Sequence, residues 1–158
     1  MLKPSTILLS SLTIFFSFMT AAYAELIEIK SDSLNIQKKG ISVYQGNAEF
    51  TQGSKYLSAD QISILRENKK VKYVKAIGSA TKLVFLKTLD ENNKLIQAWS
   101  QSMHYDLQTK IVTLNKSAKL QQDNDLIIAD KIIINLETES VVAQSNNNTR
   151  VKAEFETE

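Results

Sequence analysis

The chain of 158 residues contains no cysteine, one histidine, one proline and four glycines. Without cysteine it cannot form a disulfide, a thiolate nucleophile, a zinc–thiolate site or an iron–sulfur cluster. One histidine cannot supply a metal site that needs several imidazoles. The 19 basic and 17 acidic side chains nearly cancel, and no segment is dense in arginine and lysine, so nucleic acid is not expected as the main partner. The apolar content of 43% is enough to build a core.

The first 24 residues have the layout of a secretory signal peptide. Lys3 is the only charged side chain before Glu25, and an apolar run from residue 7 to residue 19 follows it. The small side chains of Ala22 and Ala24 then stand at the positions that a signal peptidase reads. The apolar run is shorter than the roughly 20 residues that a membrane-spanning helix needs. An uncleaved membrane anchor remains the alternative, because the whole stretch is uncharged.

Alternation of apolar and polar residues dominates the chain after this leader. Ile27 and Ile29 alternate with Glu28 and Lys30, and the pattern recurs at residues 48–51, 61–64, 112–114, 132–136, 141–143 and 151–155. A period of two indicates strands with one buried face. No segment shows the spacing of an amphipathic helix.

Six polar segments separate these runs and are typical of hairpin loops: residues 37–40, 66–70, 90–94, 106–110, 136–140 and 145–149. Short strands joined by short turns predict an antiparallel all-β fold, a sandwich, jelly roll or barrel. At the usual spacing the chain has room for about ten to thirteen strands.

The sequence also contains an internal repeat at an offset of 70 residues. Residues 41–64 and 111–134 are identical at seven aligned pairs: Ile41/Ile111, Ala48/Ala118, Gln52/Gln122, Ala59/Ala129, Asp60/Asp130, Ile62/Ile132 and Ile64/Ile134. Self-similarity at a fixed offset indicates stacked β-hairpin units that bury a face against their neighbours.

Three aspartates, Asp32, Asp60 and Asp130, each stand at the start of a predicted strand. Together they could suggest a calcium site, which needs several oxygen ligands. No glycine-rich ligand loop accompanies them, so we expect each carboxylate to bond its own backbone at a turn or bulge.

His104 is the one candidate for acid–base chemistry. Alternation places His104 and Asp106 on the face opposite to Met103 and Tyr105. No Gly-x-Ser-x-Gly elbow accompanies the histidine, so we expect a surface residue at a strand end rather than a catalytic one.

The densest basic stretch lies between Arg66 and Lys75 and includes Lys69, Lys70 and Lys72. These side chains could bind phosphate groups. Glu67 interrupts them, and the simpler interpretation is a solvated hairpin.

The order of short motifs along the chain resembles that of the OstA-like family. The motifs are residues 27–32, 44–48, 51–53, 57–62, Gly78, residues 102–107, 118–122 and 129–132. These motifs extend over nearly all of the chain after residue 24. Their order, together with the leader and the chain length, carries the resemblance. One departure is Lys116-Ser117, which replaces the family's usual glycine-containing turn before Ala118 and leaves the geometry of that turn open.

The resemblance implies an OstA-like domain over residues 25–158, folded as a curved, taco-like antiparallel β-jelly roll in the periplasm. It implies that the apolar interior holds the acyl chains of lipopolysaccharide on their way from the inner to the outer membrane. Head-to-tail oligomers would form a bridge between an inner-membrane-anchored partner, LptC, and the outer-membrane translocon component LptD. No catalytic residue, metal or cofactor is implied.

Three alternatives stay open. The first is an inner-membrane-anchored, LptC-like module of the same transport system. The second is a non-lipid structural β-repeat protein. The third is a carbohydrate-acting enzyme, which would need two carboxylates facing one cleft; the alternation provides no such pair.

Alternation predicts which residues face inward, and the resemblance places the lipid path along them. The expected lipid-binding residues are Ile27, Ile29, Leu34, Ile36, Phe50, Ile62, Ile64, Leu83, Phe85, Tyr105, Leu114 and Leu120. The run from Leu83 to Leu86 is continuously apolar, so alternation does not fix its phase. The last strand, near residues 151–155, is expected to be an edge that pairs with the opening strand of another molecule.

The first prediction concerns the leader. Protein recovered from the periplasm is expected to begin at Glu25, because Ala22 and Ala24 form the cleavage signal. N-terminal sequencing or intact mass measurement checks this. Retention of residues 1–24 would favour the anchored alternative.

Overall fold

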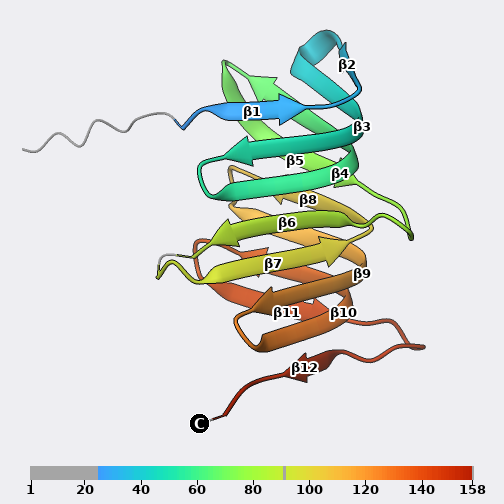
Figure 1. Cartoon of the computed structure of the whole chain (residues 1–158), viewed down its shortest axis with the longest axis vertical. Coiled ribbons are helices and arrows are strands. Elements are labelled where there is room, and N and C mark those ends of the chain that lie inside the picture. The colour runs from blue at the N-terminus through green and yellow to red at the C-terminus, as the bar shows by residue number, and fades with distance from the viewer. Residues whose placement is uncertain (1–24, 91, 158) are drawn as a thin grey trace, which may run out of the picture.

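The computed structural model describes residues 25–90 and 92–157, so the predicted signal peptide lies outside the described residues (Figure 1). Within them, twelve strands form one antiparallel sheet, and the antiparallel all-β prediction is confirmed. The only helical segment among these residues is a 3₁₀ turn, η1 (Lys38–Gly40). No helix in the described part is long and apolar enough to cross a membrane.

The strands follow one another along the chain as β1 (Ile27–Lys30), β2 (Ser33–Ile36), β3 (Ile41–Gln52), β4 (Lys55–Glu67), β5 (Lys70–Ile77), β6 (Val84–Leu89), β7 (Leu95–Ser100), β8 (Ser102–Asp106), β9 (Ile111–Gln122), β10 (Asp125–Asn135), β11 (Ser140–Gln144) and β12 (Lys152–Glu154). The longest strands are β3, β4, β9 and β10, and these are the two copies of the sequence repeat.

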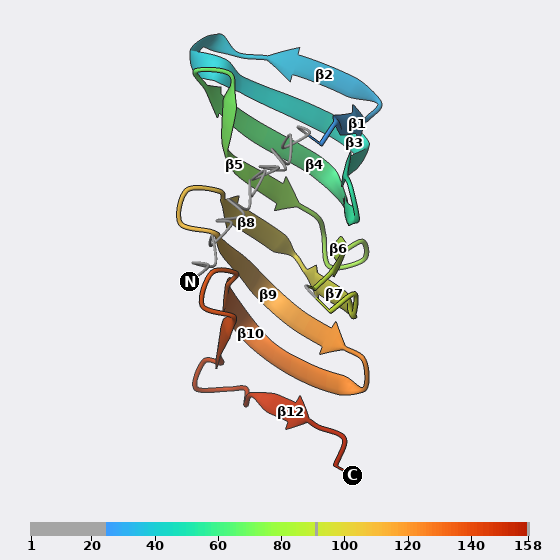
Figure 2. The same cartoon turned by 90° about the vertical axis from the view of Figure 1, so that its left-hand side faces the viewer.

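The sheet is folded over into two layers, which we call half-sheets A and B (Figures 1 and 2). The four long strands run through both. Half-sheet A has the order β2-β3-β4-β5-β8-β9-β10-β11, and half-sheet B has the order β1-β3-β4-β6-β7-β9-β10-β12. This arrangement is the curved jelly roll that the resemblance implied.

Left-handed backbone marks the bend in β3 and β9. In β3 the residues are Gly46 (φ 81°) and Asn47 (φ 44°), and in β9 they are Lys116 (φ 62°) and Ser117 (φ 53°). These pairs are 70 residues apart, so the second copy of the repeat keeps the geometry of the first without a glycine. The departure from the family pattern at Lys116 therefore does not change the turn.

At the same bend β3 and β9 each carry one residue more than their partners β4 and β10, which is a one-residue bulge. Asp60 has no partner between the paired residues Ala59 and Gln61, and the register shifts in the same way around Asp130. A single extra residue reverses the alternation. In β4 and β10 the inward side chains are therefore odd-numbered before the bend and even-numbered after it, whereas in β3 and β9 they are even-numbered throughout.

The three aspartates tie the bend to neighbouring segments. The carboxylate of Asp130 accepts a hydrogen bond from the backbone N–H of Asn146 (2.8 Å), and this bond holds the pKa of Asp130 below its usual value. Asp32 accepts one from the side-chain amide of Asn47 (3.0 Å). Asp60 lies 3.5 Å from the ammonium of Lys82. The expectation that each aspartate bonds its own backbone was wrong, because β3 and two connecting segments place polar partners at the bend.

Five of the six predicted loops join consecutive antiparallel strands. The segment at residues 145–149 is different. It joins β11 to β12, which pair with β10 in different half-sheets, so it crosses from one layer to the other.

The second prediction tests the bend. A Cβ at Gly46 would lie 2.4 Å from a carboxylate oxygen of Asp32, and the backbone there is left-handed. Gly46→Ala should therefore lower the free energy of unfolding by about 1–3 kcal/mol. Lys116→Ala is the matched control, since it keeps a Cβ at the equivalent position, and its effect should be within about 0.5 kcal/mol. Urea denaturation measures both, and equal losses would contradict the assignment.

Candidate binding groove

Cross-strand pairing aligns the inward side chains of half-sheet A in rows. Residues directly opposite each other in an antiparallel pair share a face. One row therefore crosses eight strands at Leu34, Tyr44, Ile62, Ala76, Met103, Leu114, Ile132 and Ala143. The next row runs through Ile36, Ser42, Ile64, Val74, Tyr105, Val112, Ile134 and Val141.

Half-sheet B presents a matching row to the interior. It runs through Ile29, Phe50, Leu57, Leu86, Ala98, Leu120, Ile127 and Ala153. All eight members are apolar. The molecule thus carries apolar rows along its whole length on the facing sides of its two layers.

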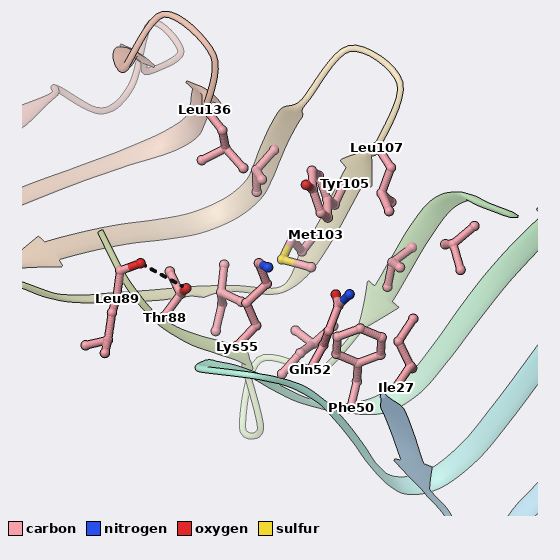
Figure 3. Close-up of a pocket in the computed structure, with 15 residues that line it drawn as sticks. Ile27, Phe50, Gln52, Lys55, Thr88, Leu89, Met103, Tyr105, Leu107 and Leu136 are labelled. Carbon is pink, nitrogen blue, oxygen red and sulfur yellow. Dashed lines mark hydrogen bonds between the residues drawn. The ribbon is translucent and has the colours of Figure 1, made fainter. Parts of the chain in front are cut away.

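A cavity of about 180 Å³ opens between the layers toward the N-terminal end (Figure 3). We call it the first pocket. Its lining is mostly aliphatic and aromatic, with three polar side chains, Gln52, Lys55 and Thr88, all from half-sheet B. The remaining lining residues are Ile27, Phe50, Leu57, Val71, Val74, Leu86, Leu89, Met103, Tyr105, Leu107, Val112 and Leu136.

A second pocket of about 270 Å³ lies further toward the C-terminal end. Its apolar lining consists of Ile96, Leu120, Ile134 and Val141, and its polar lining consists of Asp90, Asn92, Gln122 and Glu139. Val112 lines the first pocket and its cross-strand partner Ile134 lines the second. The two pockets are therefore neighbouring stretches of one interior, which we call the groove.

Tyr105 brings a hydroxyl into the first pocket. Burial raises the pKa of its phenol above the ordinary value. The group therefore stays uncharged at neutral pH and adds no anion to the lining.

Most of the predicted inward residues do face the interior. Ile27, Phe50 and Tyr105 line the first pocket and Leu120 lines the second. Four more, Ile29, Ile62, Ile64 and Leu114, belong to the inner rows and pack in the core.

Leu34 and Ile36 also belong to inner rows, but they lie on the end strand β2 and are 52% and 73% exposed. Within residues 25–90 and 92–157, no further strand continues the row beyond them.

Leu83 and Phe85 lie on the outer side, contrary to expectation. The inward residues of β6 are Val84 and Leu86, which are buried or line the first pocket. Phe85 instead packs on Trp99, with ring centroids 5.3 Å apart. Leu83 borders an open depression on the outer face beside the same tryptophan. Because residues 83–86 are all apolar, alternation allowed either the odd-numbered or the even-numbered residues to face inward. The contact with Trp99 on the outer face explains why apolar residues stand on the solvent side.

Alternation also missed several residues that line the first pocket. Leu57 could have been found from its repeat partner Ile127, which is apolar as well. Val71, Leu89, Leu107 and Leu136 lie at strand ends or in turns, where no periodic pattern marks the inward direction.

His104 lies on the outer face, as alternation predicted for it. Its ring packs on that of Tyr73, with centroids 5.4 Å apart. Among the described residues no group of three or more His, Asp or Glu side chains is arranged to hold a metal ion.

Comparison with known proteins identifies the family. Residues 28–140 match the family described as LptA/(LptD N-terminal domain) LPS transport protein. This match covers more than half of the chain, so the chain belongs to that family of lipopolysaccharide transport proteins. The resemblance to the OstA-like family is thereby confirmed.

Two curated relatives have the same description, lipopolysaccharide export system protein LptA. The relative from Haemophilus influenzae (strain Rd) is 30% identical over 129 residues, which cover 79% of this chain and 73% of that protein. The relative from Escherichia coli (strain K12) is 28% identical over 126 residues, which cover 79% of this chain and 68% of that protein.

Among solved structures, the chain is similar to LptH from Pseudomonas aeruginosa, described as the LptA-homologous periplasmic component of the lipopolysaccharide transport device. The TM-score is 0.73 at 21% identity, covering 84% of this chain and 96% of that chain. At this identity the likeness shows a shared fold.

Proposed function

We propose that this protein binds lipopolysaccharide in the periplasm and carries it from the inner to the outer membrane for outer-membrane assembly. The acyl chains lie between half-sheets A and B, and no bond is made or broken. The observation that carries the proposal is that the inner rows of the two half-sheets face each other and enclose two pockets with largely apolar walls. The chain also belongs to a family of lipopolysaccharide transport proteins.

Energetics favour such a groove. Each methylene exposed to water costs about 0.8 kcal/mol, so a lipid with several acyl chains faces a barrier on the order of tens of kcal/mol outside a membrane. Acyl tails need apolar surface and no directional bonds. The inner rows supply that surface across every strand of each half-sheet, which explains why no catalytic constellation accompanies them.

The ends of the molecule support assembly into a bridge. β1 and β2 end the two half-sheets on one side, and β11 and β12 end them on the other. End strands carry unpaired backbone groups that another strand can satisfy. Contact between unlike ends does not close on itself and therefore grows a filament. In our proposal such head-to-tail contacts join copies of this chain and reach LptC at the inner membrane and LptD at the outer membrane.

The third prediction tests the lipid path by photo-crosslinking in cells. A benzoylphenylalanine at Tyr105, which lines the first pocket, should give an adduct with lipopolysaccharide. The same residue at His104, one position away on the outer face, is the matched control and should give little or none. Leu120 and Lys119 provide a second matched pair for the same experiment. Leu120 lines the second pocket, and Lys119 lies on the outer face over the ring of Trp99.

Equal adducts from both members of each pair would contradict the groove assignment. Absence of any adduct from Tyr105 and Leu120, in variants that fold and accumulate normally, would contradict lipopolysaccharide binding itself.

The fourth prediction concerns the C-terminal end. Deleting residues 151–158 removes β12, whose side chains are exposed, and should shift the protein toward monomer while each unit stays folded. Sedimentation velocity across a concentration series measures the shift, and circular dichroism checks the fold. If the truncated and full-length proteins oligomerise alike, β12 is not part of the joint.

A further inference from the structure

The two pockets differ in the sign of their charge. Lys55 is the only charged side chain that lines the first pocket, and it is a cation. Asp90 and Glu139 are the charged side chains that line the second, and both are anions. The apolar interior is continuous from the first pocket to the second. The charged side chains that line the groove therefore change from cationic to anionic along its length.

Lys55 is placed to meet a ligand. It follows the β3–β4 turn at the rim of half-sheet B, and Figure 3 shows it extending into the pocket with Gln52 beside it. None of the ion pairs within the described residues includes Lys55. The carboxylate of Glu25 lies against Gly53 in the β3–β4 turn, and among the described residues no ion pair joins it to Lys55.

Arg66 provides a second cation on the opposite rim. On β4 it has the same even-numbered position as the inward residues Ile62 and Ile64, beyond a register irregularity between Leu65 and Arg66. Arg66 does not itself line the first pocket, but its cross-strand partner Val71 does. Arg66 is exposed and takes part in none of the ion pairs within the described residues. The one carboxylate of this hairpin, Glu67, is already matched by Lys72 at 3.9 Å.

Asp90, one of the two carboxylates of the second pocket, is held in place by hydrogen bonds. Asp90 accepts hydrogen bonds from the backbone N–H of Lys94 (2.8 Å) and from the side-chain amide of Gln122 (2.7 Å). The ammonium of Lys94 lies 3.1 Å from Asp123 and also interacts with the charge of Asp90, so it offsets part of the negative charge there. Glu139 stands in the β10–β11 turn on the other side.

We propose that the first pocket holds the phosphate-bearing headgroup of an acylated lipid at its rim, between Lys55 and Arg66, and that Asp90 and Glu139 keep such headgroups away from the second pocket. This inference rests on the proposed function and specifies which part of the ligand lies where. Cations at the rim of an apolar cavity fit an amphiphile, because the tails enter the cavity while the anion forms charge-assisted hydrogen bonds above it. One headgroup position per molecule follows.

The fifth prediction uses two probes with the same acyl chains, an acylated glucosamine disaccharide bisphosphate and the same disaccharide without phosphates. Replacing both cations, in Lys55→Gln/Arg66→Gln, should weaken binding of the bisphosphate about tenfold, since each exposed ion pair contributes up to about fivefold. Binding of the phosphate-free lipid should stay within about twofold. Lys75→Gln/Lys87→Gln removes the same charge from outward-facing positions and should change neither affinity.

The outcomes separate the two levels of the proposal. Equal loss for both lipids, or no loss for either, overturns the headgroup assignment while leaving the groove intact. Failure of the unaltered protein to bind either lipid overturns the proposed function as well. Displacement of the bisphosphate lipid by excess inorganic phosphate alone would mark a free-phosphate site and also overturn the assignment.

A reversal variant tests the second pocket. Glu139→Lys places a cation there and should raise affinity for the bisphosphate lipid about threefold without affecting the phosphate-free lipid. No change for the bisphosphate lipid would overturn the exclusion by carboxylates.

Discussion

The architecture depends on one constraint, which is that the apolar face of a single sheet must be covered, and the sheet covers itself. The alternation in each strand makes one face apolar. Four long strands, β3, β4, β9 and β10, bend at their middle and bring two parts of that face together. Short strands then extend each layer separately. Because the layers join only along the bend, the opposite rims stay apart, and an apolar interior with an accessible mouth results.

The bend itself relies on small departures from strand geometry. Left-handed residues at Gly46 and Lys116 turn β3 and β9, and the extra residue of each bulge lies there, opposite Asp60 of β4 and Asp130 of β10. The bulge has a second consequence, because it reverses the alternation halfway along β4 and β10. Without that reversal, one half of β4 and one half of β10 would present polar side chains to the interior. The repeated Ala-Asp pair in the sequence is the local mark of this change.

Alternation and the internal repeat were enough to predict an antiparallel β protein and most of the inward residues, because both follow from burial of one strand face. They failed at Leu83 and Phe85, where an outer contact with Trp99 places apolar residues on both faces. They also missed Leu107 and Leu136, whose inward direction is set by turns after the strands end. No sequence pattern marks Lys55 as a residue of the groove rim. Only the structure shows that its side chain faces the first pocket.

A groove with uniform apolar walls would let an amphiphile slide to any position, since tails gain the same free energy wherever they are buried. Charges at the mouth remove that freedom, because a headgroup anion interacts differently with a cationic and an anionic rim. The charges lie at the edge of the interior, where water still screens them, so each contact stays weak. Weak contacts select a position without trapping the ligand there. In the proposed head-to-tail filament, the basic and acidic rims would alternate along the path and give the proposed lipid ligand one preferred position in each molecule.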